Sequence, residues 1–412
     1  MKGRIHKTLQ STKGNMIQII RRNQRTLISS GFARVNRRRP CAVCGKPDWC
    51  VYTRDEQVSI CMRVSAGAVR MNRQGGFIHL HSDCSPVTGL DAQQPADDIK
   101  PSIHLARLEV RDAVYSELIR LSPASNYDRE LVSSPGGLLS RGFLRKEVAK
   151  FGALPPEMSE RDNLSHKLHR FVRKHSPSLA PQRGDVSLIG IPGFWQEPDG
   201  RVRLWKKVNY DHPFLIIPYR DAEGRIQACQ LRASSEDAEK KKRYCWLSSA
   251  GKPQGVGTGD PIHFTFIERN CSPGSLRLVT EGALKGEAFM SLRPRNFVIA
   301  TSGVGNSRAQ LIAATRWHDL LIGFDIDHRS NPSVCGQLAA LIAERARDSA
   351  VCRTPNSRTE IIVWDSPTKG IDDAALAGIP LNTINVTRWV ETLERDSLER
   401  VREVWDRLEF RL

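Results

Sequence analysis

The stretch that decides the fold runs from Leu276 to Asp372, where four short apolar runs alternate with longer segments. The four pieces read LRLVTEGALKGEAF (276–289), NFVIATSGVGNS (296–307), HDLLIGFDIDHRS (318–330) and TEIIVWDSPTKGIDD (359–373). Runs rich in Val, Ile and Leu, separated by helix-length segments, are typical of parallel strands buried on both faces. The intervening segments with helical spacing are Ala283–Leu292, Asn306–His318 and Ser333–Ser349. The sequence therefore predicts a β-α-β-α-β-α-β unit, an open α/β sheet with helices on both sides.

Acidic residues stand where two of these predicted strands end. Glu281 follows the run LVT, and Asp325 and Asp327 close the run LIGFDID. Ligand sites of open α/β sheets form at the carboxyl ends of the strands, and residues two apart point to the same side of an extended chain. Three carboxylates at one edge repel one another without a cation, and oxygen donors suit Mg²⁺ or Mn²⁺. The pattern predicts a metal site for phosphoryl or nucleotidyl transfer. The alternative is that the aspartates cap a turn and Glu281 starts a helix.

The same residues carry a family resemblance. LVTEGALKGEAF followed by FDID resembles the Toprim domain of primases, topoisomerases and related nucleases. In that family the strand-end Glu and the Asp-x-Asp pair bind the catalytic metals, which implies that role for Glu281, Asp325 and Asp327. Lys285 resembles the variant found in mobile-element primases, and we expect it to contact a triphosphate or simply to cover a helix face. TKGIDD resembles a primase turn, which makes Asp372 a further metal or nucleotide contact or the N-cap of a helix.

Composition limits the class of protein. The 412 residues predict two to four domains. The 62 Lys and Arg against 45 Asp and Glu give a net charge of +17, which suits a polyanionic partner. Ten cysteines without a secretory signal predict metal ligands and reduced thiols rather than disulfides. No apolar run approaches membrane-spanning length, so we expect a cytoplasmic protein without a membrane partner.

The chain begins with a basic segment, since its first 47 residues contain no Asp or Glu. An Arg-rich start without acids is typical of an organellar transit peptide or of a disordered arm held to phosphates. We favour an arm over residues 1–39, because the basic run continues into a cysteine cluster. A solvated tail without a role is the remaining alternative.

The cysteine cluster occupies residues 40–85. Cys41 and Cys44 form a C-x2-C knuckle with Gly45 directly after it. WCVYT and VSICM flank RDEQ as the strands of a hairpin, and GGFIHLH predicts a third strand. This is the outline of a zinc ribbon, and a unit this small needs such a staple. Our choice of four zinc ligands is Cys41, Cys44, Cys61 and His79, with Cys50 as the main competitor for the fourth place and His81 and Cys84 as further candidates.

This cluster resembles the N-terminal zinc modules of phage- and plasmid-borne primases. The match covers Pro40–Leu80 and is most specific in KPDWC (46–50). The bacterial replicative primase has a related ribbon, but with a second C-x2-C that is absent here. The resemblance implies that the ribbon holds single-stranded template and leaves the fourth ligand open.

The middle of the chain predicts a linker and an α+β subdomain. Residues 86–101 lack a periodic apolar pattern and predict the linker, and residues 102–260 predict the subdomain. Leu138–Leu154 predicts a helix N-capped by Ser140. FLIIPYRDAEGRIQACQLRAS (214–234) predicts a β-hairpin with Gly224 in its turn.

A basic and aromatic segment, KKKRYCWLSSAG (240–251), follows the hairpin. Together they resemble a segment of bacterial primase cores, which implies that Arg232 and Arg243 face nucleotide or template. The lysine run beside Tyr244 and Trp246 combines charge with stacking surface, as single-stranded nucleic acid requires. A solvated charged face is the alternative.

Residues 261–385 predict the metal-bearing domain, and residues 386–412 predict a small helical tail. The order of ribbon, hairpin and acidic edge resembles a DNA primase of a phage, plasmid or integrative element. The resemblance implies structural Zn²⁺, catalytic Mg²⁺ or Mn²⁺, a single-stranded DNA template and nucleoside triphosphates. No P-loop motif occurs, so a separate replicative helicase is the expected partner. The alternatives are a Toprim nuclease and a catalytically silent DNA-binding replication or defence protein.

Overall fold

The computed structural model divides the chain into two compact units, Met1–Asp97 and Asp98–Leu412. The predictions for residues 1–31, for the 86–101 linker and for Cys84 lie outside the residues that the structure describes. The described residues are 32–53, 58–64, 70–71, 77–81, 105–179, 187–205, 210–240, 243–268, 275–294, 296–352, 358–365 and 367–412.

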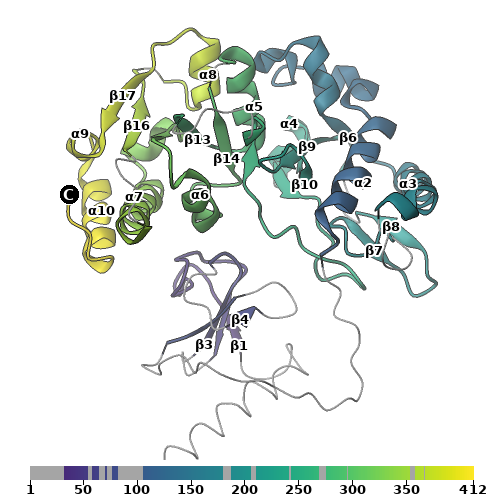
Figure 1. Cartoon of the computed structure of the whole chain (residues 1–412), viewed down its shortest axis with the longest axis horizontal. Helices are drawn as coiled ribbons and strands as arrows, with labels where there is room; N and C mark the ends of the chain where they lie inside the picture. Colours follow the sequence, from purple (N-terminus) through teal and green to yellow (C-terminus); the bar gives the residue numbers. More distant parts are fainter. Residues whose placement is uncertain are drawn as a thin grey trace, which may run out of the picture. The chain divides into compact units, whose positions relative to one another are not determined.

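Unit 1 holds a five-stranded antiparallel sheet with the strand order β1-β2-β3-β5-β4 (Figure 1). The predicted hairpin and third strand are confirmed, because β2 pairs with β3 and β3 pairs with β5. The hydrophobic core of this unit is small and is built around Val35, Cys41, Cys50 and Cys61. The strands are β1 Phe32–Arg34, β2 Val51–Thr53, β3 Val58–Cys61, β4 Arg70–Met71 and β5 Phe77–Leu80.

The first half of unit 2 is built on a four-stranded antiparallel sheet with the order β11-β10-β9-β6. The predicted hairpin is confirmed as β9 Phe214–Arg220 and β10 Ile226–Arg232, and Gly224 has the positive φ that its turn requires. α2 packs on β10 and α3 packs on α2. The other elements are α2 Leu108–Leu121, β6 Gly152–Leu154, α3 Met158–Leu179, β7 Phe194–Gln196, β8 Val202–Leu204, α4 Ser235–Lys240 and β11 Tyr244–Trp246.

The helix predicted over Leu138–Leu154 is wrong. Two short 3-10 helices, η3 Leu139–Arg141 and η4 Arg145–Lys150, take its place and lead into β6. Gly142 separates them with a φ of 87°, a left-handed conformation that ends a helix. Two further single turns, η1 Ala124–Tyr127 and η2 Asp128–Val132, precede them.

The second half of unit 2 contains the predicted parallel sheet. Its order is β12-β14-β13-β15-β16-β17, in which the four central strands are parallel and the two edge strands are antiparallel. The strands are β12 His263–Phe264, β13 Arg277–Glu281, β14 Val298–Thr301, β15 Leu320–Ile322, β16 Thr359–Val363 and β17 Asn382–Asn385. The helices are α5 Ala283–Leu292, α6 Arg308–Thr315, η6 Ile326–Arg329, α7 Pro332–Cys352, α8 Ile371–Leu376, α9 Val386–Glu391 and α10 Arg395–Arg407.

Helices cover both faces of this sheet, α5 and α8 on one and α6, α7 and α10 on the other (Figure 1). Successive strand residues point to opposite faces of the sheet, so each strand contributes side chains to two hydrophobic cores. Leu278 and Val298 pack with Phe289 and Ile371 of α5 and α8. The next residue of each strand packs with residues of α6, α7 and α10. This burial on both faces explains why the strand sequences are continuous apolar runs rather than alternating ones.

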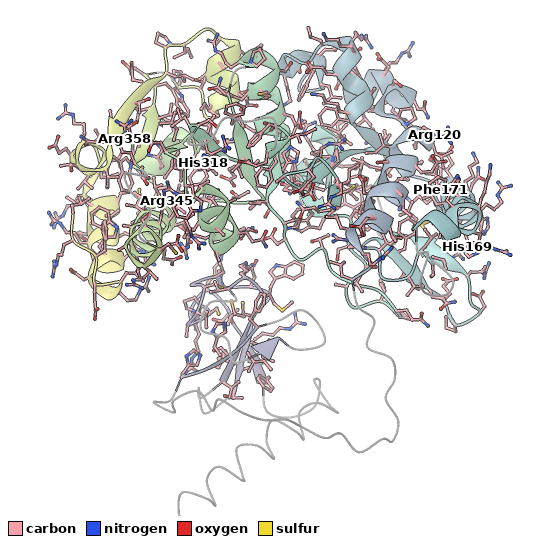
Figure 2. All side chains as sticks on the ribbon, viewed as in Figure 1. Arg120, His169, Phe171, His318, Arg345 and Arg358 are labelled. Carbon is pink, nitrogen blue, oxygen red and sulfur yellow. The ribbon has the colours of Figure 1, made fainter. Side chains whose placement is uncertain are left out.

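A buried arginine connects α6 and α7 to the sheet. Arg345 of α7 is 2% exposed, and its guanidinium donates to the carbonyl and hydroxyl oxygens of Thr315, each at 2.8 Å, and to Thr359 Oγ1 at 3.0 Å. It also donates to the carbonyl of His318, which lies beside it in Figure 2. Burial lowers the pKa of this guanidinium to about 10, and the four acceptors offset the burial of the charged group.

α5 joins the two halves of unit 2. Its residues Ala283, Leu284 and Ala288 share a core with Leu215 and Ile217 of β9. A polar connection runs beside this core, because His263 of β12 accepts from the backbone N–H of Arg220 at 2.9 Å and contacts Glu287 of α5 at 3.1 Å. The helix that follows Glu281 is therefore packed against both sheets.

Candidate functional site

The three acidic residues expected at the sheet edge come from two adjacent parallel strands. Glu281 is the last residue of β13, and Asp325 follows β15 by three residues. Asp327 lies in η6, the single turn that begins after Asp325. β13 and β15 are paired in parallel, so their carboxyl ends meet at one edge of the sheet.

The charges of the three carboxylates influence one another. Burial raises the pKa of the Glu281 carboxyl, and the charges of Asp325 and Asp327 raise it further, against the lowering effect of Lys285. The side chains of Asp325 and Asp327 are 14% and 32% exposed, so the edge is open to solvent on the side of Asp327. A group of like charges in this state attracts a cation.

Two lysines offset part of the negative charge of the edge. Lys285 of α5 forms an ion pair with Asp325. Lys369, which precedes α8, lies 3.8 Å from Asp325 Oδ2 and 3.4 Å from Asp327 Oδ2. The charge of Asp327, followed by that of Asp325, raises the pKa of Lys369. Sequence reasoning missed Lys369, although its position in the turn TKGIDD was the available signal.

The donor set fits a divalent cation by its chemistry. Two aspartates and one glutamate supply only oxygen atoms, as Mg²⁺ and Mn²⁺ prefer. The carboxylates are not gathered closely around one point, however. Among the residues that the structure describes, one group of three or more possible ligand side chains has all its donor atoms within 4.8 Å of one another. It consists of four cysteines of unit 1. A metal at the acidic edge would therefore have to displace the lysine ammonium groups.

Asp372, a candidate contact, is held inside the protein. It lies in the first turn of α8, is 2% exposed, and forms an ion pair with Arg141 of η3. Burial raises its carboxyl pKa, against the lowering effect of Arg141 and Lys285. A direct nucleotide contact by Asp372 would require this interface to open. Sequence reasoning missed Arg141, which is 231 positions away along the chain.

The two arginines expected to face a nucleotide differ in exposure. Arg232 of β10 is 6% exposed and donates to the carbonyl of Gly136 at 2.9 Å. Burial lowers its pKa, and Arg243 and Arg141 lower it further. Arg243 is exposed, next to Tyr244, which is 39% exposed and pairs with Arg232 in the sheet. Of these two arginines, Arg243 is the one that a phosphate reaches without rearrangement.

The turn η6 that carries Asp327 is fixed from behind. His328 and Trp389 are both fully buried, and Trp389 Nε1 donates to His328 Nδ1 at 3.1 Å. Cys335 donates through its thiol to the carbonyl of His328 at 2.6 Å. Burial lowers the pKa of His328 to about 4, so its imidazole is neutral at physiological pH. The local sequence does not predict the contact between Trp389 and His328, because these residues are 61 positions apart.

A second candidate site lies in unit 1, where four cysteines converge. Cys44 and Cys50 sulfurs are 3.7 Å apart, Cys50 and Cys61 sulfurs are 4.0 Å apart, and Cys41 completes the group. Hydrogen bonding with Cys41 lowers the pKa of the Cys44 thiol and raises those of Cys50 and Cys61. Four sulfurs in this arrangement match the donor set of a structural zinc ion.

The structure corrects the choice of fourth ligand, because Cys50 and not His79 lies with Cys41, Cys44 and Cys61. His79 pairs with Ser59 in the sheet, and its Nε2 lies 2.8 Å from the carbonyl of Val64. His81 is exposed and contacts Ser59 Oγ at 2.7 Å. The register of β3 and β5 thus gives both histidines other partners.

The cysteine loop presents an aromatic side chain to solvent. Cys50 N–H donates to the Asp48 carbonyl at 2.8 Å and closes a three-residue turn around Trp49, whose φ is 66°. A turn of this kind is rare and strained for a bulky residue. Arg63 holds the turn by donating to the carbonyl and carboxylate of Asp48 at 2.9 and 2.5 Å. Trp49 is 68% exposed in this position.

No protein-family model and no curated protein matches this chain. Among solved structures, the Aquifex aeolicus primase with its zinc-binding and RNA polymerase domains is similar over 92% of this chain and 86% of that chain, at 12% identity and a TM-score of 0.44. A DNA primase domain from Pseudomonas aeruginosa is similar over 74% and 97%, at 14% identity and 0.44. A primase catalytic domain bound to single-stranded DNA is similar over 73% and 96%, at 14% identity and 0.42. At these identities and TM-scores the likeness to primase cores assigns no activity, and function rests on this chain's own residues.

Proposed function

We propose that this protein is a primase-like nucleotidyltransferase of the Toprim type, which synthesises short primers on single-stranded DNA. The observation that carries the proposal is the acidic edge of β13 and β15, where Glu281, Asp325 and Asp327 influence one another and two lysines balance their charge. Acidic strand ends of a parallel sheet next to cationic side chains are suited to a metal–phosphate ligand.

Each side chain has a role in this proposal. Glu281, Asp325 and Asp327 would hold Mg²⁺ or Mn²⁺, which on binding neutralises charge on the transferring phosphoryl group. Lys285 and Lys369 would exchange their carboxylate partners for triphosphate oxygens when metal and nucleotide arrive together. The ion pairs would then offset much of the negative charge of the edge between turnovers.

Template binding would be shared by unit 1 and the exposed end of β11. The exposed indole of Trp49 and the exposed side chains of Arg37, Arg38 and Arg39 combine a stacking surface with positive charge. Arg243 and Tyr244 offer the same combination in unit 2. A zinc ion on the four cysteines would hold the Trp49 turn in shape. The positive net charge of the chain favours this polyanionic partner.

The proposal extends to the setting of the reaction. A protein with these features would act in the cytoplasm in replication of a phage, plasmid or integrative element, using nucleoside triphosphates and working with a separate replicative helicase. Among the described parts of the chain, no helix combines the length and apolar character needed to cross a membrane.

Two assays on the full chain test the function together. Labelled nucleoside triphosphates with single-stranded DNA and Mg²⁺ report primer synthesis, and labelled single-stranded DNA without nucleotides reports cleavage. We expect primers from the wild type and none from Asp325→Asn. Cleavage without synthesis, again lost in Asp325→Asn, would replace the proposal by a Toprim nuclease.

A catalytically silent DNA-binding protein is the second candidate, and one observation favours it. Lys285 and Lys369 form ion pairs with the carboxylates that would bind a metal. If neither synthesis nor cleavage occurs while single-stranded DNA still binds, these ion pairs are permanent and the edge serves the fold alone.

A further inference from the structure

The C-terminal segment reaches the back of the acidic edge. β17 leads into α9, which packs on β16 and β17, and α10 packs along α7 (Figure 1). Two hydrogen bonds connect this segment to η6, one between side chains and one between backbone groups. Trp389 of α9 donates from its indole to His328, and the N–H of Glu394 donates to the carbonyl of Arg329 at 3.2 Å.

The contact with His328 is made at the residue that follows Asp327. The two residues are adjacent in η6, and the imidazole is fully buried against the indole. Nδ1 accepts the indole hydrogen, so the hydrogen-bond network assigns the imidazole proton to Nε2. The carbonyl of the same residue accepts from Cys335, so ring and backbone are both held.

One further backbone hydrogen bond of the loop reaches another segment, because the N–H of Ile326 donates to the carbonyl of Lys369 at 3.0 Å, and two others are local. The carbonyl of Asp325 accepts from the N–H of His328 at 3.1 Å, and that of Asp327 accepts from the N–H of Asn331 at 2.8 Å. The two local bonds set the shape of the turn but not its place relative to β13, which carries Glu281. Contacts with other elements set that place, and Trp389 supplies a directional one through a side chain.

We propose that Trp389 is a positioning residue for the acidic edge: through His328 it holds Asp327 where its carboxylate and that of Glu281 bind the same metal. This inference rests on the proposed function. It assigns to the C-terminal segment a role in metal binding, beyond covering one face of the sheet. Outer-sphere partners of this kind typically contribute roughly 10–100-fold to metal affinity, and we expect the lower end here because Trp389 acts through a second residue.

Mn²⁺ binding to the full chain, followed by electron paramagnetic resonance, tests the proposal without relying on activity. We expect Trp389→Phe to weaken Mn²⁺ binding about tenfold. Trp405→Phe is the matched control, because Trp405 of α10 is also buried in the C-terminal segment and donates from its indole to the carbonyl of Ala339 at 3.0 Å. Both variants lose one indole hydrogen bond, but only the first touches η6.

A second pair of variants keeps the test valid if Trp389→Phe does not fold. His328→Asn retains an acceptor near the place of Nδ1, and His328→Leu removes it, so we expect Mn²⁺ binding to be weaker in the Leu variant. Equal Mn²⁺ affinity in Trp389→Phe, Trp405→Phe and wild type, or in the two His328 variants, would overturn the inference alone. If Asp325→Asn leaves wild-type Mn²⁺ binding unchanged, the metal is not at the acidic edge, and the inference and the proposed function both fall.

Discussion

Lys285 of α5 and Asp325 at the end of β15 form an ion pair across the acidic edge. The two side chains are 16% and 14% exposed, so the pair is largely shielded from water. A lysine thus does what a metal ion would also do, which is to offset part of the repulsion among three carboxylates. The acidic edge can therefore bind either of two cationic partners, a lysine ammonium group or a metal ion.

Asp325→Asn should cost stability as well as activity. The sequence alone, through repulsion among carboxylates, predicts unchanged or slightly raised stability, but the structure pairs Asp325 with Lys285 and Lys369. Leaving Lys285 without its partner should lower the free energy of unfolding by about 1–2 kcal/mol. Primer synthesis should fall by several orders of magnitude, because the metal acts on charge that develops in the transition state. Urea denaturation and the synthesis assay measure the two effects, with the exposed Asp365→Asn as control. Near-normal synthesis in Asp325→Asn would contradict the metal assignment.

Lys285→Met should separate metal binding from nucleotide binding. Without its ammonium group, Asp325 loses a competitor, so Mn²⁺ should bind a few-fold more tightly. The nucleotide KM should rise, because a triphosphate contact is lost. Lys150→Met is the control, since Lys150 pairs with Glu287 on the same helix but not with the acidic edge. Weaker Mn²⁺ binding in Lys285→Met would show that the lysine supports the site rather than competing for it.

Glu281→Gln should change stability with pH in a defined direction. The pKa of Glu281 is raised from 4.5, so the folded protein binds this proton more tightly than the unfolded chain. The favourable contribution is complete below pH 4.5 and is lost as pH rises through the folded pKa. In Mg²⁺-free buffer the variant should therefore be more stable than wild type at pH 7, and the difference should shrink toward pH 4.5.

Glu287→Gln on α5, the helix that follows Glu281, should shift stability in the opposite direction. Burial alone would raise the pKa of Glu287, but hydrogen bonds from His263 and Lys150 hold it below its ordinary value. This variant should be less stable than wild type at pH 7, with a difference that shrinks as pH falls. Thermal unfolding curves of both variants across pH measure the contrast. If both variants changed stability at pH 7 in the same direction relative to wild type, the burial of like charges around Glu281 would be contradicted.

Cys50→Ser should release zinc, whereas His79→Gln should keep it. Cys50 lies among the four sulfurs, and His79 contacts the carbonyl of Val64 instead. Because metal binding free energy is folding free energy in units this small, unit 1 should also lose its structure in Cys50→Ser. Elemental analysis of the purified proteins gives the zinc content directly. Zinc lost from His79→Gln but kept in Cys50→Ser would restore the ligand set expected from sequence.

Trp49→Gly should lower the affinity for single-stranded DNA without lowering the stability of unit 1. Glycine adopts positive φ without strain, so zinc-loaded unit 1 should be as stable as wild type or more so. Single-stranded DNA should bind more weakly, since loss of one stacked base costs roughly 1–3 kcal/mol. Trp49→Phe, which keeps an aromatic ring, should bind at an intermediate level. Fluorescence anisotropy at fixed salt measures the affinities, and unchanged binding by Trp49→Gly would remove Trp49 from the template surface.

Much of the sheet could be predicted because its signals are local. The predicted Ala283–Leu292 helix coincides with α5, and the four central strands occupy the apolar runs expected for strands buried on both faces. The edge strands β12 and β17 were not predicted, because two residues, HF, and the polar run NTIN carry no strand periodicity. The Ser140 helix failed for a local reason as well, since Gly142 favours a left-handed break over a continuous helix.

By itself, the sequence determined which residue types stand at the strand ends and in the cysteine cluster, because strand periodicity and ligand spacing are properties of neighbouring residues. Only the tertiary structure decided the partners. Strand register set Cys50 rather than His79 among the sulfurs, helix packing brought Arg141 to Asp372, and the fold of the C-terminal segment brought Trp389 to His328. The last two contacts join residues that are remote in the chain, and the energies of all three depend on burial and distance, neither of which is encoded in local spacing.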